Sequence, residues 1–267
     1  DFFVSSLNSR IEPLSPPSKR LTYIDLFCGG GGLSLGVQSA AKFLGYNPKL
    51  CLAADIDAVA LDLVKKHFKP IYARSKTVED LIQFEVDYTG TINKFISDPI
   101  ILDTQIAALK GRIDLLVGGP PCHGHSNLNN STRRFDPRHL LYMIMPAFAV
   151  ALDIPNIIIE NVQTITNARE NVVGLTKSLL HQHGYSIEEC KLLASNFGVA
   201  QSRIRHFLIA SKTRNLTSMS LINRFKTDEI SFGEACTNMP KLESRLSNIE
   251  VISNISQENI ERIDYLH

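Results

Sequence analysis

The chain has 267 residues, of which 44% are hydrophobic and 21% charged, and neither glycine nor proline dominates its composition. This length suits one large α/β domain or two small ones, and no apolar run reaches the roughly 18 to 20 residues that a membrane-spanning helix needs. The formal net charge of +1 argues against a module that only binds nucleic-acid phosphate, but it is compatible with an enzyme that has a local basic patch.

The N-terminus and the cysteines bear on where the protein works. The first residues lack an initiator Met and the basic-then-apolar pattern of a signal peptide, so we expect a trimmed start. The cysteines are odd in number and scattered, which predicts a reducing, intracellular compartment without a disulfide framework. In a bacterium this compartment is the cytoplasm, and in a eukaryote it includes the nucleus. The five cysteines are Cys28, Cys51, Cys122, Cys190 and Cys236.

Strands and helices are predicted to alternate from residue 21, after an N-terminal arm (1–20) that is rich in proline and serine. Short apolar runs predict strands at Leu21–Phe27, Lys49–Ala54, Ile113–Val117, Asn156–Ile159, Tyr185–Ala194 and His206–Ala210. Apolar residues at helical spacing predict helices at Leu33–Leu44, Ala58–Phe68, Leu140–Leu152 and Val172–His183. The alternation predicts an α/β fold with a doubly wound, mostly parallel, Rossmann-like sheet, in which ligands bind at the carboxyl ends of the strands.

A glycine-rich segment, 25–36, lies where the first predicted strand turns into the first helix. Glycines let backbone N–H groups approach a ligand at a helix N-terminus, so this turn is a candidate binding loop. The dinucleotide-binding pattern fails because Ser34 stands where its last glycine is needed, and the phosphate-loop pattern fails because Val37 stands where lysine is needed. A glycine-rich turn without a ligand is the alternative.

Two aspartates, Asp55 and Asp57, follow the second predicted strand. An acidic residue at this point is well placed to accept hydrogen bonds from the hydroxyls of a ribose. Both residues also suit the N-cap of the next helix, and we assign Asp57 to that role.

A cysteine loop, 118–126, follows the buried strand Ile113–Val117. Cys122 on such a loop is a candidate nucleophile, because the thiolate is the reactive form of cysteine and a loop of this kind can stabilise it. A buried structural cysteine is one alternative. A metal site of Cys122, His123 and His125 is another, but ligands this close seldom complete a tetrahedral site alone, and we expect no metal.

Three further charged residues complete the set of candidates. Glu160 ends another buried strand, and Arg203 and Arg205 lie at alternate positions where the last strand begins. Alternate residues of a strand point the same way, so the two arginines can hold an anion or a polar base edge together. Surface ion pairs are the ordinary alternative for each arginine.

These motifs, in this order, resemble those of the DNA (cytosine-5)-methyltransferases, most closely the bacterial restriction–modification type. The similarity covers about residues 21–211 and includes two further blocks, Asp136–Tyr142 and Asn196–Ala200. The family's last two motifs and its target-recognition region should follow residue 211, but we find no counterpart of either motif in 212–267. We therefore expect these residues to start a linker or recognition region. The chain would then be a fragment, an incomplete protein or the larger half of a split enzyme.

The resemblance implies a S-adenosylmethionine-dependent methyltransferase that swings a cytosine out of double-stranded DNA. It gives Cys122 the attack on C6 of the base, Glu160 the binding of N3 and the exocyclic amine, Arg205 the binding of O2, and Arg203 a place towards the sugar–phosphate backbone. Transfer of the methyl group would convert the cofactor into S-adenosylhomocysteine. The residues that match the cofactor site are Phe27, Gly29, Gly30, Gly32, Asp55, Ile56, Pro121 and Leu141.

Several positions depart from the family pattern. His123, His125 and Ala200 replace residues that only flank the site. Ile56 stands where the family sometimes has an aromatic residue, and no acid stands near Ser75, where a third-strand acidic residue is expected. Asp80, Asp87 and Asp98 are the candidates within the insertion 76–109. A cytosine-5 tRNA methyltransferase and a catalytically silent binding homologue are the alternative functions, and the intact set of Cys122, Glu160 and Arg205 argues against the second.

Overall fold

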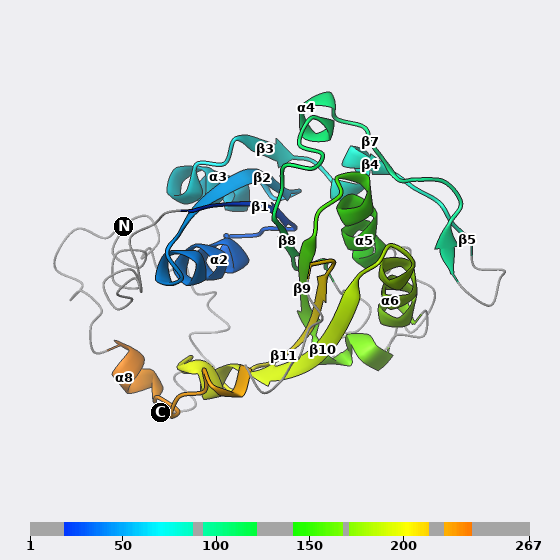
Figure 1. Ribbon diagram of the computed structural model, residues 1–267. Helices are drawn as coiled ribbons and strands as arrows, with labels where there is room; N and C mark the ends of the chain where they lie inside the picture. The colour runs from blue at the N-terminus through cyan, green and yellow to red at the C-terminus, as the bar shows by residue number, and fades with distance from the viewer. Residues whose placement is uncertain (1–18, 88–92, 122–140, 168–170, 214–221, 237–267) are drawn as a thin grey trace, which may run out of the picture.

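The computed structural model describes residues 19–87, 93–121, 141–167, 171–213 and 222–236 (Figure 1). In this part of the chain, seven strands form one sheet in the order β10-β11-β9-β8-β1-β2-β3. Neighbouring strands from β9 to β3 are parallel, whereas β11 is antiparallel to both β9 and β10. The strands are β1 (Lys19–Leu26), β2 (Tyr46–Asp55), β3 (Tyr72–Ser75), β8 (Leu115–Gly118), β9 (Asn156–Val162), β10 (Ser186–Leu193) and β11 (Ile204–Ser211). The predicted doubly wound α/β fold is confirmed.

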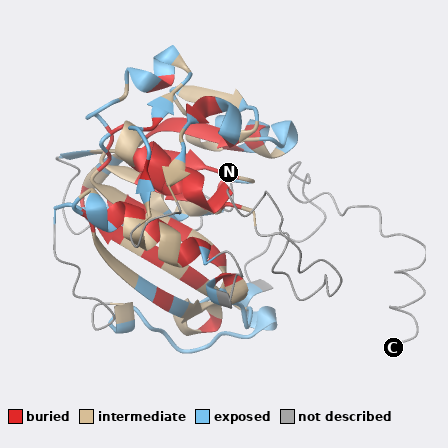
Figure 2. Ribbon diagram, turned by 90° about the vertical axis from the view of Figure 1, so that its right-hand side faces the viewer, coloured by how far each residue is buried: buried red, intermediate tan, exposed pale blue. Residues whose placement is uncertain are grey.

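Helices cover both faces of this sheet. Helices α2 (Gly32–Phe43) and α3 (Ala58–Phe68) pack on β1 and β2, and helices α5 (Leu141–Ala151) and α6 (Val172–Gln182) pack on β8, β9 and β10. Each face has its own apolar cluster, with Leu50 and Val64 in the α2–α3 layer and Ile24 and Phe148 in the α5–α6 layer. Figure 2 shows the buried residues concentrated in the strands and on the helix sides that face them.

Helix boundaries follow from local capping. The predicted helix Ala58–Phe68 matches α3, and the Asp57 side chain accepts hydrogen bonds from the backbone N–H groups of Val59 and Ala60, so Asp57 is the N-cap as expected. Helix α6 ends just before Gly184, whose φ of +80° lies in the left-handed region that favours glycine after a helix.

The insertion 76–109 forms small elements that the apolar pattern did not predict. They are η1 (Val78–Leu81), the antiparallel pair β4 (Ile82–Gln83) and β7 (Ile100–Ile101), the pair β5 (Val86–Asp87) and β6 (Lys94–Phe95), and α4 (Thr104–Ala107). The Ser178 hydroxyl and the Gln182 amide of α6 both donate to the Asn93 carbonyl. The insertion is therefore attached to the α5–α6 side of the sheet.

The last described segment passes beside the end of β10. It follows η3 (Gln163–Asn167) and η4 (Ala194–Phe197) in the chain and ends in α8 (Phe232–Cys236). The Thr227 N–H donates to the Asn196 carbonyl at 2.9 Å, and the Ser195 hydroxyl donates to Glu229 at 2.7 Å. None of the helices in the described ranges is long and apolar enough to cross a membrane.

Candidate active site

The register of the sheet brings the predicted site residues to one edge. Leu26, the last residue of β1, pairs with Ala54 of β2 on one side and with Gly118 of β8 on the other. Gly118 also pairs with Ile159, directly before Glu160 on β9. Because β11 is antiparallel to β9, Arg205 near the amino-terminal end of β11 pairs with Val162 at this same edge. Segments up to 180 residues apart in the sequence therefore meet at the carboxyl ends of the parallel strands.

The glycine-rich loop between β1 and α2 has an inward and an outward side. Gly31 has a φ of +86°, and a Cβ added to it would lie 2.6 Å from Cε2 of Phe68 on α3. A Cβ on Gly29, Gly30 or Gly32 would meet no atom of the described residues within 4 Å. Gly31 is therefore required by packing, whereas the other three leave open space in front of the loop.

Asp55 holds this loop to the end of β2. Its Oδ2 accepts a hydrogen bond from the Gly29 N–H at 2.8 Å, and its Oδ1 accepts one from the Asp57 N–H at 2.8 Å. Each carboxylate oxygen can accept a second hydrogen bond, so both oxygens keep capacity for a hydroxyl of a ligand. Asp55 therefore has a structural contact, and its predicted ribose contact stays a prediction.

The loop that follows β8 begins in a tightly packed position. A Cβ on Gly118 would lie 2.7 Å from the Leu26 carbonyl oxygen and 2.8 Å from the Met145 side chain, and a Cβ on Gly119 would lie 3.2 Å from Oε2 of Glu160. The Asn161 amide donates to the Pro120 carbonyl at 3.0 Å. Gly118 thus lets the chain pass close to β1 and α5, and Gly119 lets it pass close to Glu160 on β9. The predicted nucleophile Cys122, with His123 and His125, lies just outside the described residues.

Glu160 and Arg205 form an ion pair at the edge, with 2.8 Å between Arg205 Nε and Glu160 Oε1. The side chains are 26% and 22% exposed, so both are largely withdrawn from water. Burial raises the pKa of the Glu160 carboxyl, and the positive charges of Arg205 and Arg203 partly offset that rise. Arg203 is exposed and precedes β11. The structure therefore brings Glu160 together with both predicted arginines.

The remaining predicted residues lie on the same edge. Phe27 follows β1 directly with a φ of +56° and is half-buried. Ile56 follows β2 and is 71% exposed, so it is accessible to a ligand at this edge. Pro121 is the last described residue before Cys122, and Leu141 begins α5 and is buried. The contact of each with a cofactor stays a prediction.

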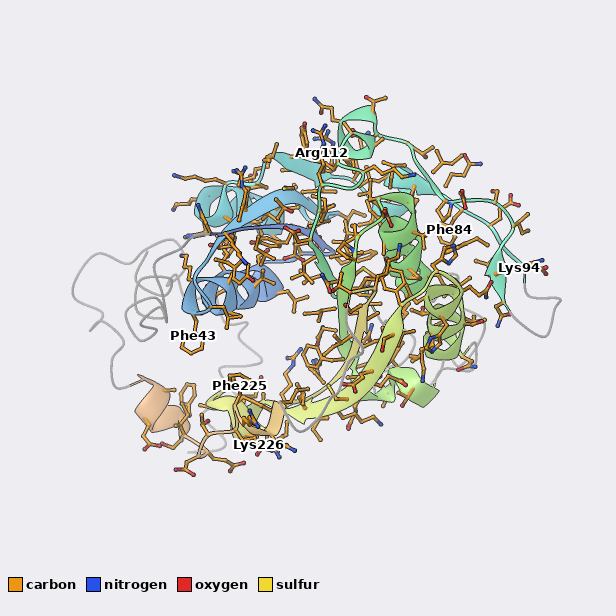
Figure 3. The ribbon with its side chains drawn as sticks, in the orientation of Figure 1. Phe43, Phe84, Lys94, Arg112, Phe225 and Lys226 are labelled. Atoms are coloured by element: carbon orange, nitrogen blue, oxygen red, sulfur yellow. The ribbon has the colours of Figure 1, made fainter. Side chains whose placement is uncertain are left out.

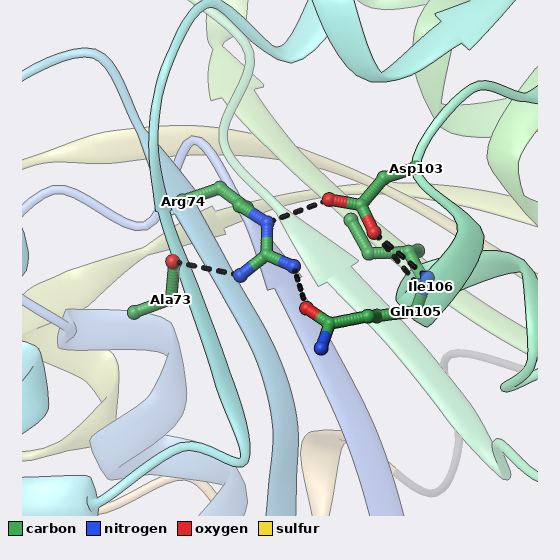
Figure 4. Close-up of polar contacts among 5 residues, drawn as sticks. All are labelled: Ala73, Arg74, Asp103, Gln105 and Ile106. Atoms are coloured by element: carbon green, nitrogen blue, oxygen red, sulfur yellow. Dashed lines mark hydrogen bonds and ion pairs between the residues drawn. The ribbon is translucent and has the colours of Figure 1, made fainter.

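The sequence did not identify an ion pair at the end of β3. Arg74 Nε lies 2.7 Å from Asp103 Oδ2, and its guanidinium also donates to Gln105 and to the Ala73 carbonyl (Figure 4). The Arg74 guanidinium holds the pKa of the Asp103 carboxyl below its usual range. Ser75 does end β3. Asp103 is thus a carboxylate beside this strand end that was not among our candidates, and the role of Asp80, Asp87 or Asp98 stays a prediction.

One open cleft lies away from these residues. It has a volume of about 520 Å³ and lies at the amino-terminal side of β1, β8 and β9, where Arg20, Arg112 and Lys212 contribute to its lining. In Figure 3, Arg112 lies at the top of the view, whereas Phe225 and Lys226 of the last described segment lie at the bottom. Because Asp114 and Pro155, which also line the cleft, directly precede β8 and β9, the cleft is at the opposite edge of the sheet from Glu160 and Arg205. Within the described ranges no group of three His, Cys, Asp or Glu side chains could hold a metal ion.

Comparison with known proteins identifies the family. The C-5 cytosine-specific DNA methylase family matches residues 21–266 of the chain. The type II methyltransferase M1.BsuMI of Bacillus subtilis is 34% identical over 251 residues, which make up 93% of this chain and 56% of that protein. The type II methyltransferase M.DdeI of Desulfomicrobium norvegicum is 26% identical over 232 residues, which make up 84% of this chain and 49% of that protein.

A solved structure has the same fold. The crystal structure of the S. pombe Dnmt2 methyltransferase superposes with a TM-score of 0.54 at 20% sequence identity, over 78% of this chain and 55% of that chain. This chain spans about half the length of the curated relatives it matches.

Proposed function

Because the chain belongs to the C-5 cytosine-specific DNA methylase family, we propose that it carries the catalytic centre of an enzyme that methylates C5 of cytosine in double-stranded DNA. The observation that carries this proposal is the Glu160–Arg205 pair, which lies at the carboxyl edge of the sheet beside the loop that leads to Cys122. The named type II relatives favour a role in restriction–modification in the bacterial cytoplasm.

Glu160 and Arg205 have the chemistry to hold a cytosine that has been turned out of the duplex. The raised pKa of Glu160 favours a carboxyl that donates a hydrogen bond to N3, while its other oxygen accepts from the exocyclic amine. The Arg205 Nε pairs with Glu160, and one Nη donates a hydrogen bond to the Ile204 carbonyl. The remaining N–H groups of the guanidinium are available to donate to O2 of the base. Arg203 is exposed beside this pair and can bind a phosphate of the DNA backbone.

Cys122 supplies the nucleophile. Its thiolate adds to C6 of the base, and Glu160 stabilises the electron density that moves towards N3. The C5 carbon then becomes nucleophilic and receives the methyl group. Transfer of the C5 proton to water and departure of the Cys122 thiolate then restore the aromatic ring, so that one methyl group has replaced one proton and the enzyme is regenerated.

S-adenosylmethionine fits the glycine-rich loop, and it supplies an electrophilic methyl group on a sulfonium. Open space in front of Gly29, Gly30 and Gly32 gives the ligand room at the N-terminus of α2. Asp55 would accept from the ribose hydroxyls. The other walls of the pocket would be Phe27 and Ile56 on the adenine side, and Pro121 and Leu141. No step of the proposed chemistry needs a metal ion.

We further propose the division of the chain that the motifs suggest. Residues 1–20 would be an arm, 21–211 the catalytic domain, and 212–267 the start of a linker or recognition region. Base readout would then depend on a C-terminal segment or a second chain, since direct readout needs an element that fits a groove of the duplex.

A methyl-transfer assay on the complete protein tests the proposed function. With tritiated cofactor and mixed-sequence DNA, the Cys122→Ser variant should lose at least a thousandfold in rate but bind S-adenosylhomocysteine as the wild type does. Cys190→Ser is the matched control, because Cys190 lies buried on β10, and it should stay within a few-fold of wild type. Activity of Cys122→Ser within tenfold of wild type would exclude Cys122 as the nucleophile.

A further inference from the structure

A fully buried carboxyl group lies beneath the glycine-rich loop. Asp25 on β1 is 0% exposed, and its Oδ2 accepts a hydrogen bond from the Ser34 hydroxyl at 2.6 Å. Its Oδ1 is buried and has no hydrogen-bond partner among the described residues. A buried carboxylate with an unsatisfied oxygen is costly, so this position needs a physical explanation.

The surroundings of Asp25 contain no compensating cation in the described part of the chain. Helix α2 contributes the Ser34 hydroxyl, and Tyr23 on the same strand has its own hydroxyl bonded to Gln38 of α2. Asp55 at the end of β2 and the Cys28 thiol after β1 are the other titratable groups that interact with it. Burial and, to a smaller extent, the negative charge of Asp55 raise the pKa of Asp25 to about 7, although the hydrogen bonds from Ser34 offset part of the rise.

The Asp25–Ser34 hydrogen bond spans the binding loop. Asp25 precedes the loop on β1, and Ser34 is the third residue of α2, so the bond joins the two ends of the segment that holds Gly29, Gly30 and Gly32. Ser34 is itself 0% exposed. The position of the first turn of α2 relative to β1 therefore depends on this contact.

We propose that Asp25 is a positioning residue that acts through Ser34, and that it carries a proton in the empty site and releases it to water when the cofactor binds. This inference rests on the proposed function, because it assumes that the cofactor occupies the glycine-rich loop. The bound cofactor brings an ammonium group into a region of low dielectric constant, where a nearby positive charge favours the carboxylate form of an acid. The carboxylate is also the stronger acceptor for the Ser34 hydroxyl.

The proposal requires cofactor affinity to rise with pH. If Asp25 loses its proton on binding, affinity should be about tenfold higher at pH 8 than at pH 6, because the ionised fraction of the free protein rises about tenfold over that interval. Calorimetric titration of the complete protein with S-adenosylhomocysteine, in two buffers of different ionisation enthalpy, should show release of about half a proton at pH 7.

Asp25→Asn is the decisive variant, because asparagine is a permanently neutral isostere. It should bind no more tightly than the wild type does at pH 6, lose the Asp25 contribution to pH dependence and release no proton. Titration of the ligand's own ammonium is common to both proteins, so the difference between them isolates Asp25. Asp62→Asn is the matched control, because Asp62 is an exposed acid on α3 that pairs with Lys65 at the surface, and it should behave as the wild type does.

Two results would overturn the inference while leaving the proposed function intact. One is an equal pH dependence of affinity in wild type and Asp25→Asn. The other, which remains available if the variant does not fold, is a ¹³C carboxyl signal of Asp25 in the free wild-type protein that titrates below pH 5. Failure of the wild type to bind S-adenosylhomocysteine at pH 8 would instead refute the cofactor site itself, and this inference with it.

Discussion

Gly119→Ala tests whether the position of Glu160 matters for catalysis. The alanine Cβ would lie 3.2 Å from Glu160 Oε2, closer than an ordinary van der Waals contact, so one of the two groups must move by a few tenths of an ångström. Gly119 does not have a positive φ, so its backbone accepts alanine without strain. Glu160 is also held on its other side by Arg205 at 2.8 Å. The added methyl group therefore displaces Glu160 within its ion pair.

The expected loss is in kcat. A misplacement of about 1 Å at a catalytic group can cost about a hundredfold, so a few tenths of an ångström should cost roughly three- to tenfold, or about 1 kcal/mol in the barrier. The affinity for S-adenosylhomocysteine should change less than about twofold, because a Cβ on Gly119 would meet no described atom of the glycine-rich loop within 4 Å. The free energy of unfolding should fall by about 1 kcal/mol or less.

Single-turnover methylation with saturating cofactor and DNA measures this effect. Gly36→Ala is the matched control: a Cβ there meets no described atom within 4 Å, and alanine in helix α2 should raise stability by about 0.5 to 1 kcal/mol without changing kcat. A Gly119→Ala enzyme with unchanged kcat would show that Glu160 tolerates displacement, which would refute its assignment as a positioned catalytic group.

Three other substitutions address the cofactor side of the edge. Asp55→Ala should weaken binding of S-adenosylhomocysteine by about 1 to 3 kcal/mol, and unchanged affinity in calorimetry would leave Asp55 with only its Gly29 and Asp57 contacts. Gly31→Ala should lower the free energy of unfolding by about 1 to 3 kcal/mol in urea titration, because its φ is +86° and its Cβ would collide with Phe68; wild-type stability would contradict that packing. For Asp25, the raised pKa means that the folded state binds more protons, so wild-type stability should fall as pH rises from about 4 to 7, by at most about 4 kcal/mol. Asp25→Asn should abolish this fall in the free energy of unfolding. If the free energy of unfolding changed with pH in the same way in both proteins, Asp25 would not have a pKa near 7.

Apolar patterns predicted the large elements well, and they missed elements whose stability depends on partners distant in sequence. The α3 bounds were right, because Asp57 supplies a side-chain cap and the apolar spacing continues to Phe68. Strand β9 was predicted to stop at Ile159, but it continues to Val162, since Glu160 and Val162 pair with Phe207 and Arg205 of β11. A polar residue ends an apolar run in the sequence, whereas an antiparallel neighbour can still continue the ladder.

Contacts between residues distant in the chain could likewise not be predicted from the sequence. Asp103 reaches Arg74 across 29 residues of an insertion built from two-residue strands, which have no periodic pattern to detect. The N-cap of α4, where the Asp103 side chain accepts from the N–H groups of Gln105 and Ile106, was the one local signal available. A search for capping residues within the insertion would have placed a helix start at Asp103.

The run of four glycines contains two kinds of position that composition alone cannot separate. Gly31 turns inward against Phe68 and is needed for the packing of α3, whether or not a ligand binds. Gly30 and Gly32 border open space and have no positive φ, so folding alone does not explain the absence of a Cβ at these two positions, whereas the φ of +48° at Gly29 itself favours glycine. A ligand that approaches the backbone closely does explain it. Substitution at Gly31 should therefore act on stability, and substitution at Gly30 on cofactor affinity, which separates the structural role of the run from its binding role.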